Sequence, residues 1–373
     1  MRDVLIAGVG MGPFGNHGPA KALPLARQAA LAALADAHLR YTDIDAVVVG
    51  TAHPLTTRGI YIAKELGLTG VPVTHVTNAS ATGLSAIHAA RQAIGCGDAS
   101  RVLVIGVDSP QRAVPVEEVI IGEGNFPPVV SFALWARRRM HDHGTTREHL
   151  ATIAAKNWNY ARANPCAARR APQEVDIARV LASRMVADPF TSMMCTPWGE
   201  GAAAAVVCAA DAWPTSSGHP RVRLAASQCA SDLYSTDLVL EGAIVGPPEL
   251  TRDTAARAYA AAGVSPSDVD VVQVHDAFAI EELLYYEQLG FCTTGEAEAL
   301  IERGAFGPDS RRRFGLPEFS TDGGLIARGH PGAPTGLAQI HETVRRLRAG
   351  DRIGVCHLLG AGSVCVVQVL VRD

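Results

Sequence analysis

Short apolar runs of strand length alternate along the chain with stretches whose apolar positions repeat at helical spacing. Residues 4–9 and 46–50 are aliphatic and β-branched, as expected for buried strands, and residues 20–37 carry a helical apolar stripe. Another helical stripe follows Ser80, and residues 101–107 form the next apolar run. Strands that alternate with helices in this way predict an α/β fold with a doubly wound, largely parallel sheet.

The second half of the chain repeats the plan of the first. Residues 267–274 repeat the pattern of residues 42–49. Further along, the helix that includes Thr335 repeats the one that includes Thr82, with seven identities over 17 positions, which favours internal duplication over chance similarity. A duplicated unit is expected to pack about a pseudo-twofold axis, with the two matched helices central and their N-terminal turns at one cleft.

Between the two copies the pattern is less regular, which predicts a segment inserted into the duplicated frame. The first half then comprises residues 1–108 and 202–245, and the second half comprises residues 246–373. Residues 109–201 form the insertion. We expect it to cover the cleft and shape the substrate site, because long segments of this kind commonly carry function.

Composition narrows the classes of function. A net charge of −4 and a sequence pI near 6.4 give no basis for nucleic-acid binding. The eight cysteines are scattered without CxxC pairs or metal-site spacing, and most lie in apolar runs, so we expect most of them to be buried reduced thiols and predict no metal. No apolar run reaches membrane-spanning length, and the chain begins as a strand without a signal peptide, which predicts a soluble cytoplasmic protein. The glycines of residues 8–12 lack the dinucleotide-binding spacing, so no NAD site is predicted.

Residues able to act as nucleophile, acid or base occur where predicted strands end. In an α/β sheet the carboxyl ends of strands and the turns after them form the active crevice, so these residues are expected to meet there. They are Ser80 at a helix start, His275 and Asp276 after a strand, His330 between glycine and proline, and Cys356 with His357 before the last strand.

Several of these residues also have a purely structural interpretation. Ser80 could serve only as a helix N-cap, and Cys356 could be one more core thiol. The place of Ser80 in the duplicated cleft favours the chemical interpretation for that residue. His88 and His341 lie at matched positions inside the two repeated helices, which indicates a structural role for both.

Taken together, the motifs resemble the thiolase superfamily over essentially the whole chain. The opening glycine motif, the Ser80 turn and the loops at His330 and Cys356 follow the family's order. His275 and Asp276, in place of the family's Asn-Glu pair, resemble its sterol-carrier-protein branch, as does the loop after Cys356. The resemblance implies α/β/α/β/α layers, with two mostly parallel five-stranded sheets about a pseudo-twofold axis and a covering insertion.

The resemblance also implies roles for the residues of the reaction itself. Ser80 stands where the family has its acyl-accepting cysteine, and His330 would deprotonate it and help bind the thioester oxygen. Cys356 would be the acid/base that moves a proton at the carbon α to the thioester. His357 is the alternative residue of that loop to point into the pocket.

Two further groups would complete the implied site. His275 or Asp276 would orient a water or the substrate carbonyl. Backbone N–H groups at Ser80 and Gly360 would form a second oxyanion site.

The departure from the family is the serine itself, because a hydroxyl is far less acidic than a thiol and needs a well-placed, oriented base. Three interpretations follow. Ser80 could replace a cysteine by substitution, it could be natural and carry acyl groups slowly, or covalent catalysis could be absent. In the last case Cys356 and His330 would make or break carbon–carbon bonds non-covalently, as in a retro-aldol step.

The implied activity is acyl transfer or Claisen condensation or cleavage on an acyl thioester, with coenzyme A as carrier and an acyl carrier protein as the alternative. The resemblance also implies a homodimer and no permanently bound cofactor. The competing interpretation is a retro-aldolase, or a catalytically weak acyl- or lipid-binding subunit that works with a small accessory protein. The basic clusters at residues 137–139 and 311–313 are interpreted as solvated faces, either of which could grip the phosphates of coenzyme A.

Overall fold

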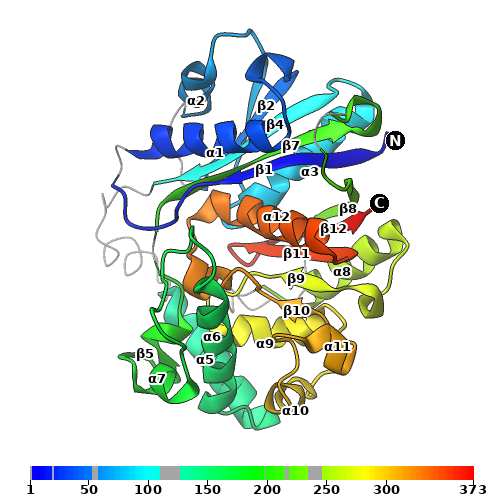
Figure 1. The fold of residues 1–373 in the computed structure, drawn as a ribbon. Helices are drawn as coiled ribbons and strands as arrows, with labels where there is room; N and C mark the ends of the chain where they lie inside the picture. The colour runs from blue at the N-terminus through cyan, green and yellow to red at the C-terminus, as the bar shows by residue number, and fades with distance from the viewer. Residues whose placement is uncertain are drawn as a thin grey trace.

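The computed structural model describes residues 2–18, 21–52, 58–109, 127–197, 199–214, 218–233 and 246–373 (Figure 1). The first half contains β1 (Val4–Met11), α1 (Ala22–Asp36), β2 (Ala46–Gly50), α2 (Arg58–Leu66), β3 (Val73–Val76), α3 (Thr82–Cys96), β4 (Arg101–Asp108) and, after the insertion, β7 (Gly201–Ala209). The insertion contains α5 (Pro128–His143), α6 (Arg147–Ala161), α7 (Ile177–Ala182), β5 (Met185–Ala187) and β6 (Phe190–Thr191).

The remaining elements repeat the order of the first half. They are β8 (Val222–Ser231), α8 (Pro248–Ala262), β9 (Val271–Gln273), α9 (Ala279–Gln288), α10 (Ala297–Glu302), α11 (Ser310–Phe314), β10 (Glu318–Phe319), a π-helical turn (Gly324–Arg328), α12 (Gly332–Ala349), β11 (Ile353–Gly360) and β12 (Val364–Arg372). Of the described helices, none is long and apolar enough to cross a bilayer.

The main sheet makes the duplication visible as strand order. It runs β10-β9-β11-β12-β8-β1-β7-β4-β2-β3, so β8-β12-β11-β9-β10 repeats β1-β7-β4-β2-β3 outward from a central join. The join is an antiparallel pairing of β1 with β8 at Leu5 and Arg223. In each half the three outermost strands are parallel and the two nearest the join run antiparallel to their neighbours. The duplicated α/β fold is confirmed, and its two five-stranded sets form one mixed ten-stranded sheet.

Helices α3 and α12 lie between the two halves and pack against strands of both, while α1 and α8 cover the outer faces (Figure 1). The two central helices meet at matched glycines. A Cβ added at Gly83 would lie 2.4 Å from the carbonyl oxygen of Ala333, and one at Gly336 would lie 2.6 Å from the backbone nitrogen of Leu84. The repeated Thr-Gly-Leu sequence therefore marks a backbone-to-backbone crossing that only glycine permits.

The insertion packs on the second half of the molecule. Its helix α6 contacts α9, with Lys156 bound to Glu282 at 2.5 Å, and Asn157 of α6 binds Asp276, just before α9, at 2.8 Å. Since β8 occupies in the second set the place of β1 in the first, the strand order favours a boundary between the halves before β8 rather than at residue 245. The division into 1–108 with 202–245, 109–201 and 246–373 stays a prediction, and residues 110–126 of the insertion lie outside the described part of the chain.

Candidate active site

The two helix N-termini at the centre of the molecule bring Ser80 and His330 together. Ser80 lies in the turn before α3, directly after Ala79, whose φ of 45° is unusual for a residue with a side chain. His330 comes just before α12. The Ser80 hydroxyl oxygen lies 2.9 Å from Nε2 of His330, although 250 positions separate the two residues. The predicted meeting of the two repeated turns at one site is thus observed.

Thr335 determines which nitrogen of His330 carries the proton. Its hydroxyl donates to the carbonyl of Pro331 at 2.9 Å, so it can only accept from Nδ1 of His330, 2.7 Å away. This network assigns the proton to Nδ1 and leaves the lone pair of Nε2 facing Ser80. The Ser80 hydroxyl therefore donates to Nε2, as a serine does to a histidine that serves as its base.

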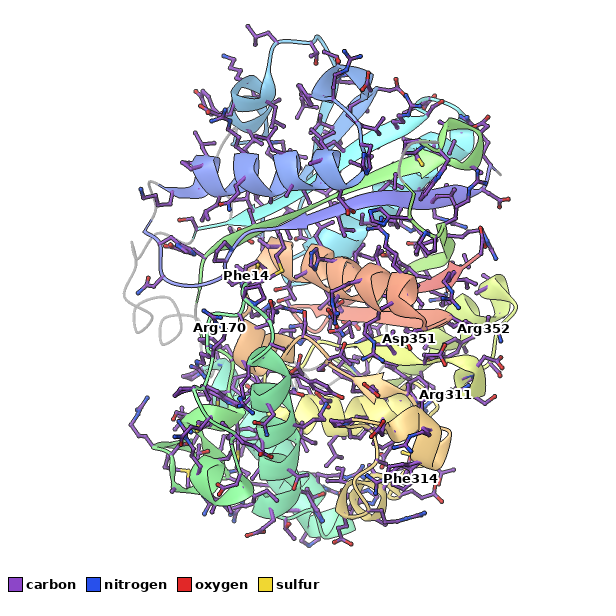
Figure 2. The ribbon with its side chains drawn as sticks, in the orientation of Figure 1. Phe14, Arg170, Arg311, Phe314, Asp351 and Arg352 are labelled. Atoms are coloured by element: carbon purple, nitrogen blue, oxygen red, sulfur yellow. The ribbon has the colours of Figure 1, made fainter. Side chains whose placement is uncertain are left out.

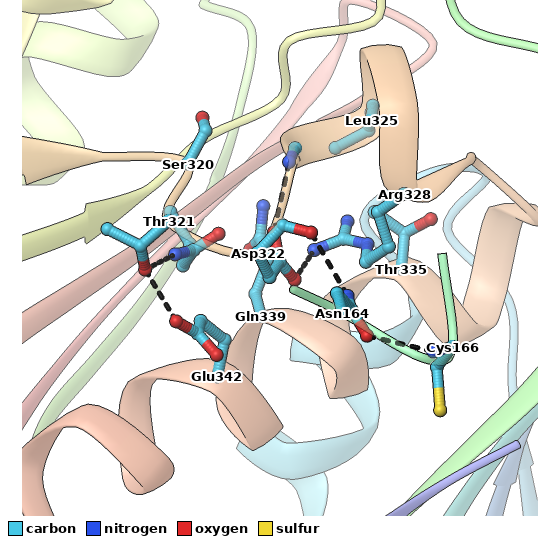
Figure 3. Close-up of polar contacts among 12 residues, drawn as sticks. Asn164, Cys166, Ser320, Thr321, Asp322, Leu325, Arg328, Thr335, Gln339 and Glu342 are labelled. Carbon is cyan, nitrogen blue, oxygen red and sulfur yellow. Dashed lines mark hydrogen bonds and ion pairs between the residues drawn. The ribbon is translucent and has the colours of Figure 1, made fainter. Parts of the chain in front are cut away.

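A buried polar network holds the segment that leads into His330 (Figure 3). Asp322 pairs with Arg328 at the end of the π-helical turn, and its backbone carbonyl accepts a hydrogen bond from Asn164 at 3.0 Å. Gly329, with a φ of 105°, then turns the chain toward His330. The position of the base thus depends on contacts between the insertion and the second half.

Asp276 belongs to this support rather than to the reacting group. It is fully buried, its carboxylate accepts from the amide of Asn157 and from the backbone of Leu325, and no part of it reaches His330 in these contacts. Burial raises its pKa well above the ordinary value, and the nearby carboxylate of Glu282 adds to the rise. Of the predicted pair, the structure places His275, and not Asp276, at the site.

His275 lies edge-on to the His330 ring, with 5.1 Å between ring centroids. Its Nδ1 is 2.8 Å from the Oε1 atom of Glu281, and the residue is 7% exposed. Its Nε2 is buried and, within the described residues, has no hydrogen-bond partner. A buried nitrogen without a partner among the residues that the structure describes offers a position where a substrate group fits.

Cys356 and His357 are neighbours on β11, so their side chains point to opposite faces of the sheet. Cys356 is buried in the core, 3.2 Å from the Thr343 hydroxyl, and burial raises the pKa of its thiol to about 12. Thr343 is two turns beyond Thr335, about 12 Å along α12. The structure therefore does not bring Cys356 to Ser80 and His330, and an acid/base role for it gains no support.

His357 lies on the other face, where its ring is 4.4 Å from that of Tyr285 and its Nε2 is 3.1 Å from the Thr251 hydroxyl. It is fully buried, and burial lowers its pKa to about 3, with a smaller contribution from His275. His357 is thus a neutral imidazole beside the site, on the side of His275.

Gly360 ends β11 against the Ser80 turn. A Cβ at Gly360 would lie 2.3 Å from the carbonyl oxygen of Asn78, so the strand end and the turn touch through their backbones. The predicted proximity of Gly360 and Ser80 is observed. Their shared role as an oxyanion site stays a prediction.

The basic clusters are held by carboxylates of the protein itself. Arg139 is 6% exposed and paired with Glu287 and Glu298, so its interpretation as part of a solvated face is wrong. In the second cluster Arg311, labelled in Figure 2, pairs with Asp270. These ion pairs give both clusters a structural role. The alternative, that they bind the phosphates of coenzyme A, gains no support.

Two features near the site escaped sequence reasoning. Thr335 and Glu281 each orient a histidine, and the only sequence signal for Thr335 was its place in the repeat. A separate cavity of about 340 Å³ lies on the flank of α12, lined by residues that include Asn164, Cys166 and His341 and none of the predicted site residues. No group of three or more potential metal ligands gathers within the described residues.

Comparison with known proteins gives the family. Residues 4–175 match the thiolase N-terminal domain and residues 245–354 match the thiolase C-terminal domain-like model. Sterol carrier protein 2 of Bos taurus is 33% identical over 98% of this chain and 72% of its own length. The acetyl-CoA acetyltransferase of Methanothermobacter thermautotrophicus is 32% identical over the full length of both chains.

Solved structures share the fold. The Ltp2-ChsH2(DUF35) aldolase matches with a TM-score of 0.84 at 24% identity, covering 100% of this chain and 98% of that one. Human mitochondrial 3-ketoacyl-CoA thiolase in complex with CoA matches with a TM-score of 0.69 at 18% identity, covering 100% of this chain and 98% of that one. The relatives, the family models and the fold agree: this chain belongs to the thiolase superfamily.

Proposed function

We propose that the protein acts on acyl-CoA thioesters and that Ser80 is its acyl acceptor, with His330 as the activating base. The observation that carries this proposal is the 2.9 Å contact from the Ser80 hydroxyl to a His330 whose tautomer is fixed by Thr335. Acyl-CoA is the expected thioester because the full-length relative is an acetyl-CoA acetyltransferase.

The chemistry balances on these residues alone. The Ser80 oxygen attacks the thioester carbonyl while its proton passes to Nε2 of His330. The carbon–sulfur bond then breaks, the thiolate of coenzyme A takes that proton, and an acyl ester remains on Ser80. The negative charge that develops on the carbonyl oxygen lies near the N-terminus of α3, where the helix dipole favours it.

A second candidate function is retro-aldol cleavage of a β-hydroxyacyl thioester without a covalent intermediate. Two observations favour it. Neither of the two thiols of the implied mechanism is at the site, because position 80 is serine and Cys356 is in the core. A similar fold belongs to an aldolase whose name joins Ltp2 to ChsH2(DUF35), so an accessory protein is part of this candidate.

The homodimer and the cytoplasmic location are proposals of the same kind. Strand β3 forms an outer edge of the sheet, and Tyr61 and Leu68 beside it are exposed to 52% and 87%, which supports pairing of two copies there. Light scattering in solution would measure a mass twice that of the chain, and a monomer would contradict the proposal.

Intact-mass spectrometry after incubation with acyl-CoA separates the two functions. Acyl transfer predicts an adduct on the Ser80 peptide and loss of turnover in Ser80→Ala. Retro-aldol cleavage predicts turnover without an adduct and its survival in Ser80→Ala. A companion Ser80→Cys variant with unchanged activity would contradict the nucleophile proposal, because a thiol at this position should react faster.

A further inference from the structure

Glu281 is buried directly behind His275, and each of its two carboxylate oxygens has a hydrogen-bond partner. Oε1 lies 2.8 Å from Nδ1 of His275, and Oε2 accepts from the backbone N–H of Phe278 at 3.0 Å. The residue is 2% exposed and lies in the first turn of α9, where the helix dipole stabilises a carboxylate. Tyr285 donates a third, longer hydrogen bond to Oε1 at 3.4 Å.

We propose that Glu281 is the positioning residue of a second base, His275, in the site described under the proposed function, on which this inference rests. The carboxylate accepts a hydrogen bond from Nδ1–H of His275, which keeps the proton on Nδ1 and leaves a lone pair on Nε2. That nitrogen is buried beside His330 and has no partner among the described residues. This position suits a group of the substrate that gives up a proton.

The two histidines are held by different chemistry, which separates their tasks. Nδ1 of His330 donates to the neutral hydroxyl of Thr335, whereas Nδ1 of His275 donates to the carboxylate of Glu281. An imidazole that gains a proton beside a carboxylate forms an ion pair, so His275 is built to take a proton from the substrate and hold it.

The proton taken by His275 comes from the acyl chain of the substrate and not from Ser80. In a Claisen step it leaves the α-carbon, whose electron pair forms the new carbon–carbon bond to the acyl ester on Ser80. The ester carbon–oxygen bond then breaks, and the Ser80 oxygen takes up the proton that His275 accepted. In a retro-aldol step it leaves the β-hydroxyl, the oxygen–carbon bond becomes a carbonyl, and the pair of the broken carbon–carbon bond passes to the α-carbon. Nε2 then returns the proton to that carbon, which closes the balance.

Glu281→Gln tests the arrangement because it keeps the shape and changes one acceptor to a donor. The N–H of Phe278 can only donate, so the amide oxygen of Gln must face it. The amide NH₂ then faces Nδ1 of His275, which has to become the acceptor, and the proton moves to Nε2. A single substitution should therefore reverse the role of the nitrogen that faces the substrate.

The experiment is ¹⁵N NMR of histidine-labelled, ligand-free protein at pH 8, together with acyl-CoA turnover. In wild type we expect an unprotonated Nε2 on His275. In E281Q we expect a protonated Nε2 and about 100-fold less turnover, since the equivalent exchange behind the base of a serine protease costs even more. Glu302→Gln is the control, because the carboxylate of Glu302 also pairs with a histidine, 3.0 Å from Nε2 of His149, away from the site.

The outcomes test the positioning role of Glu281 separately from the proposed function of the site. A protonated Nε2 in wild type overturns it even if E281Q fails to fold, and so does an unchanged tautomer or unchanged turnover in a folded E281Q. The expected tautomer shift in a protein that turns over no acyl-CoA would support the positioning role and contradict the proposed function.

Discussion

The turns that precede α3 and α12 use the same threonine for different ends. In the first half the Thr82 hydroxyl accepts from the backbone of Asn78 at 2.8 Å and donates to the carbonyl of Ala79 at 2.6 Å, which closes the turn that carries Ser80. In the second half the Thr335 hydroxyl accepts from the ring of His330 and donates to Pro331. One device, repeated by duplication, fixes a backbone in one half and a side chain in the other.

The asymmetry of the site therefore lies in the residues that the two threonines hold. The frame is symmetric in strand order and helix crossing, and the chemistry enters through the residue that each threonine holds. A change in the second turn should therefore affect catalysis, and the same change in the first should affect folding.

The largest expected effect is the loss of the base. His330→Ala should lower kcat/KM by about 1,000-fold, because the Ser80 hydroxyl then has no acceptor for its proton. His341→Ala, within the helix α12 that His330 precedes, is the matched control, and we expect kcat/KM within a few-fold of wild type. Steady-state kinetics would measure both, and an equal loss in the two variants would contradict a special role for His330.

Substitutions of the two threonines test most directly whether Thr82 serves folding and Thr335 serves catalysis. Thr335→Val should lower kcat by about 10- to 100-fold, since His330 loses the acceptor that fixes its tautomer. Thr82→Val should cost about 1–2 kcal/mol in the free energy of unfolding, because it leaves the N–H of Asn78 without its acceptor. Kinetics and urea unfolding on both variants would test this; reversed effects would overturn the division of tasks.

Acid should destabilise the second half through His357. Its pKa falls from 6.5 to about 3 on folding, so below pH 6.5 the unfolded chain binds a proton that the native chain refuses. Stability is therefore intact above pH 6.5 and decreases as the pH falls toward 3. At pH 5.5 this amounts to about 1.4 kcal/mol, which His357→Gln should remove. Urea unfolding of both proteins at pH 7.5 and 5.5 measures the difference; equal pH slopes would refute the assignment.

The smallest effect is expected at Cys356. Cys356→Ala should cost about 1 kcal/mol of stability, through a small cavity beside Thr343, and leave turnover within twofold of wild type. Its thiol should also resist alkylation at pH 8 in the folded protein, because it is buried with a pKa of about 12. Loss of turnover comparable to that of His330→Ala would restore the acid/base role that its geometry does not support.

Most of the frame could be predicted from the sequence because it rests on apolar periodicity. The strand at Ala46–Gly50 has the predicted bounds, and the duplicated helices meet as expected. Strand-end placement also predicted the meeting of Ser80 with His330.

The sequence did not predict which of two neighbouring residues points into the site and which points away from it. His275 points into the site while Asp276 supports the π-helical turn, and Cys356 enters the core while His357 faces Tyr285. A shift of one position along a strand changes the face, and no motif fixes that register. The orienting roles of residues such as Glu281 arise from contacts that only the folded chain defines.

The crossing of α3 and α12 at two glycines determines how little the spacing between the Ser80 and His330 turns can change. The nucleophile and its base are carried by separate helices, and the gap between those helices is closed by backbone atoms with no side chain to absorb an error. One methyl group at Gly83 would act as a wedge and push the two catalytic turns apart. The protein can therefore change what its turns carry far more freely than it can change the spacing between them.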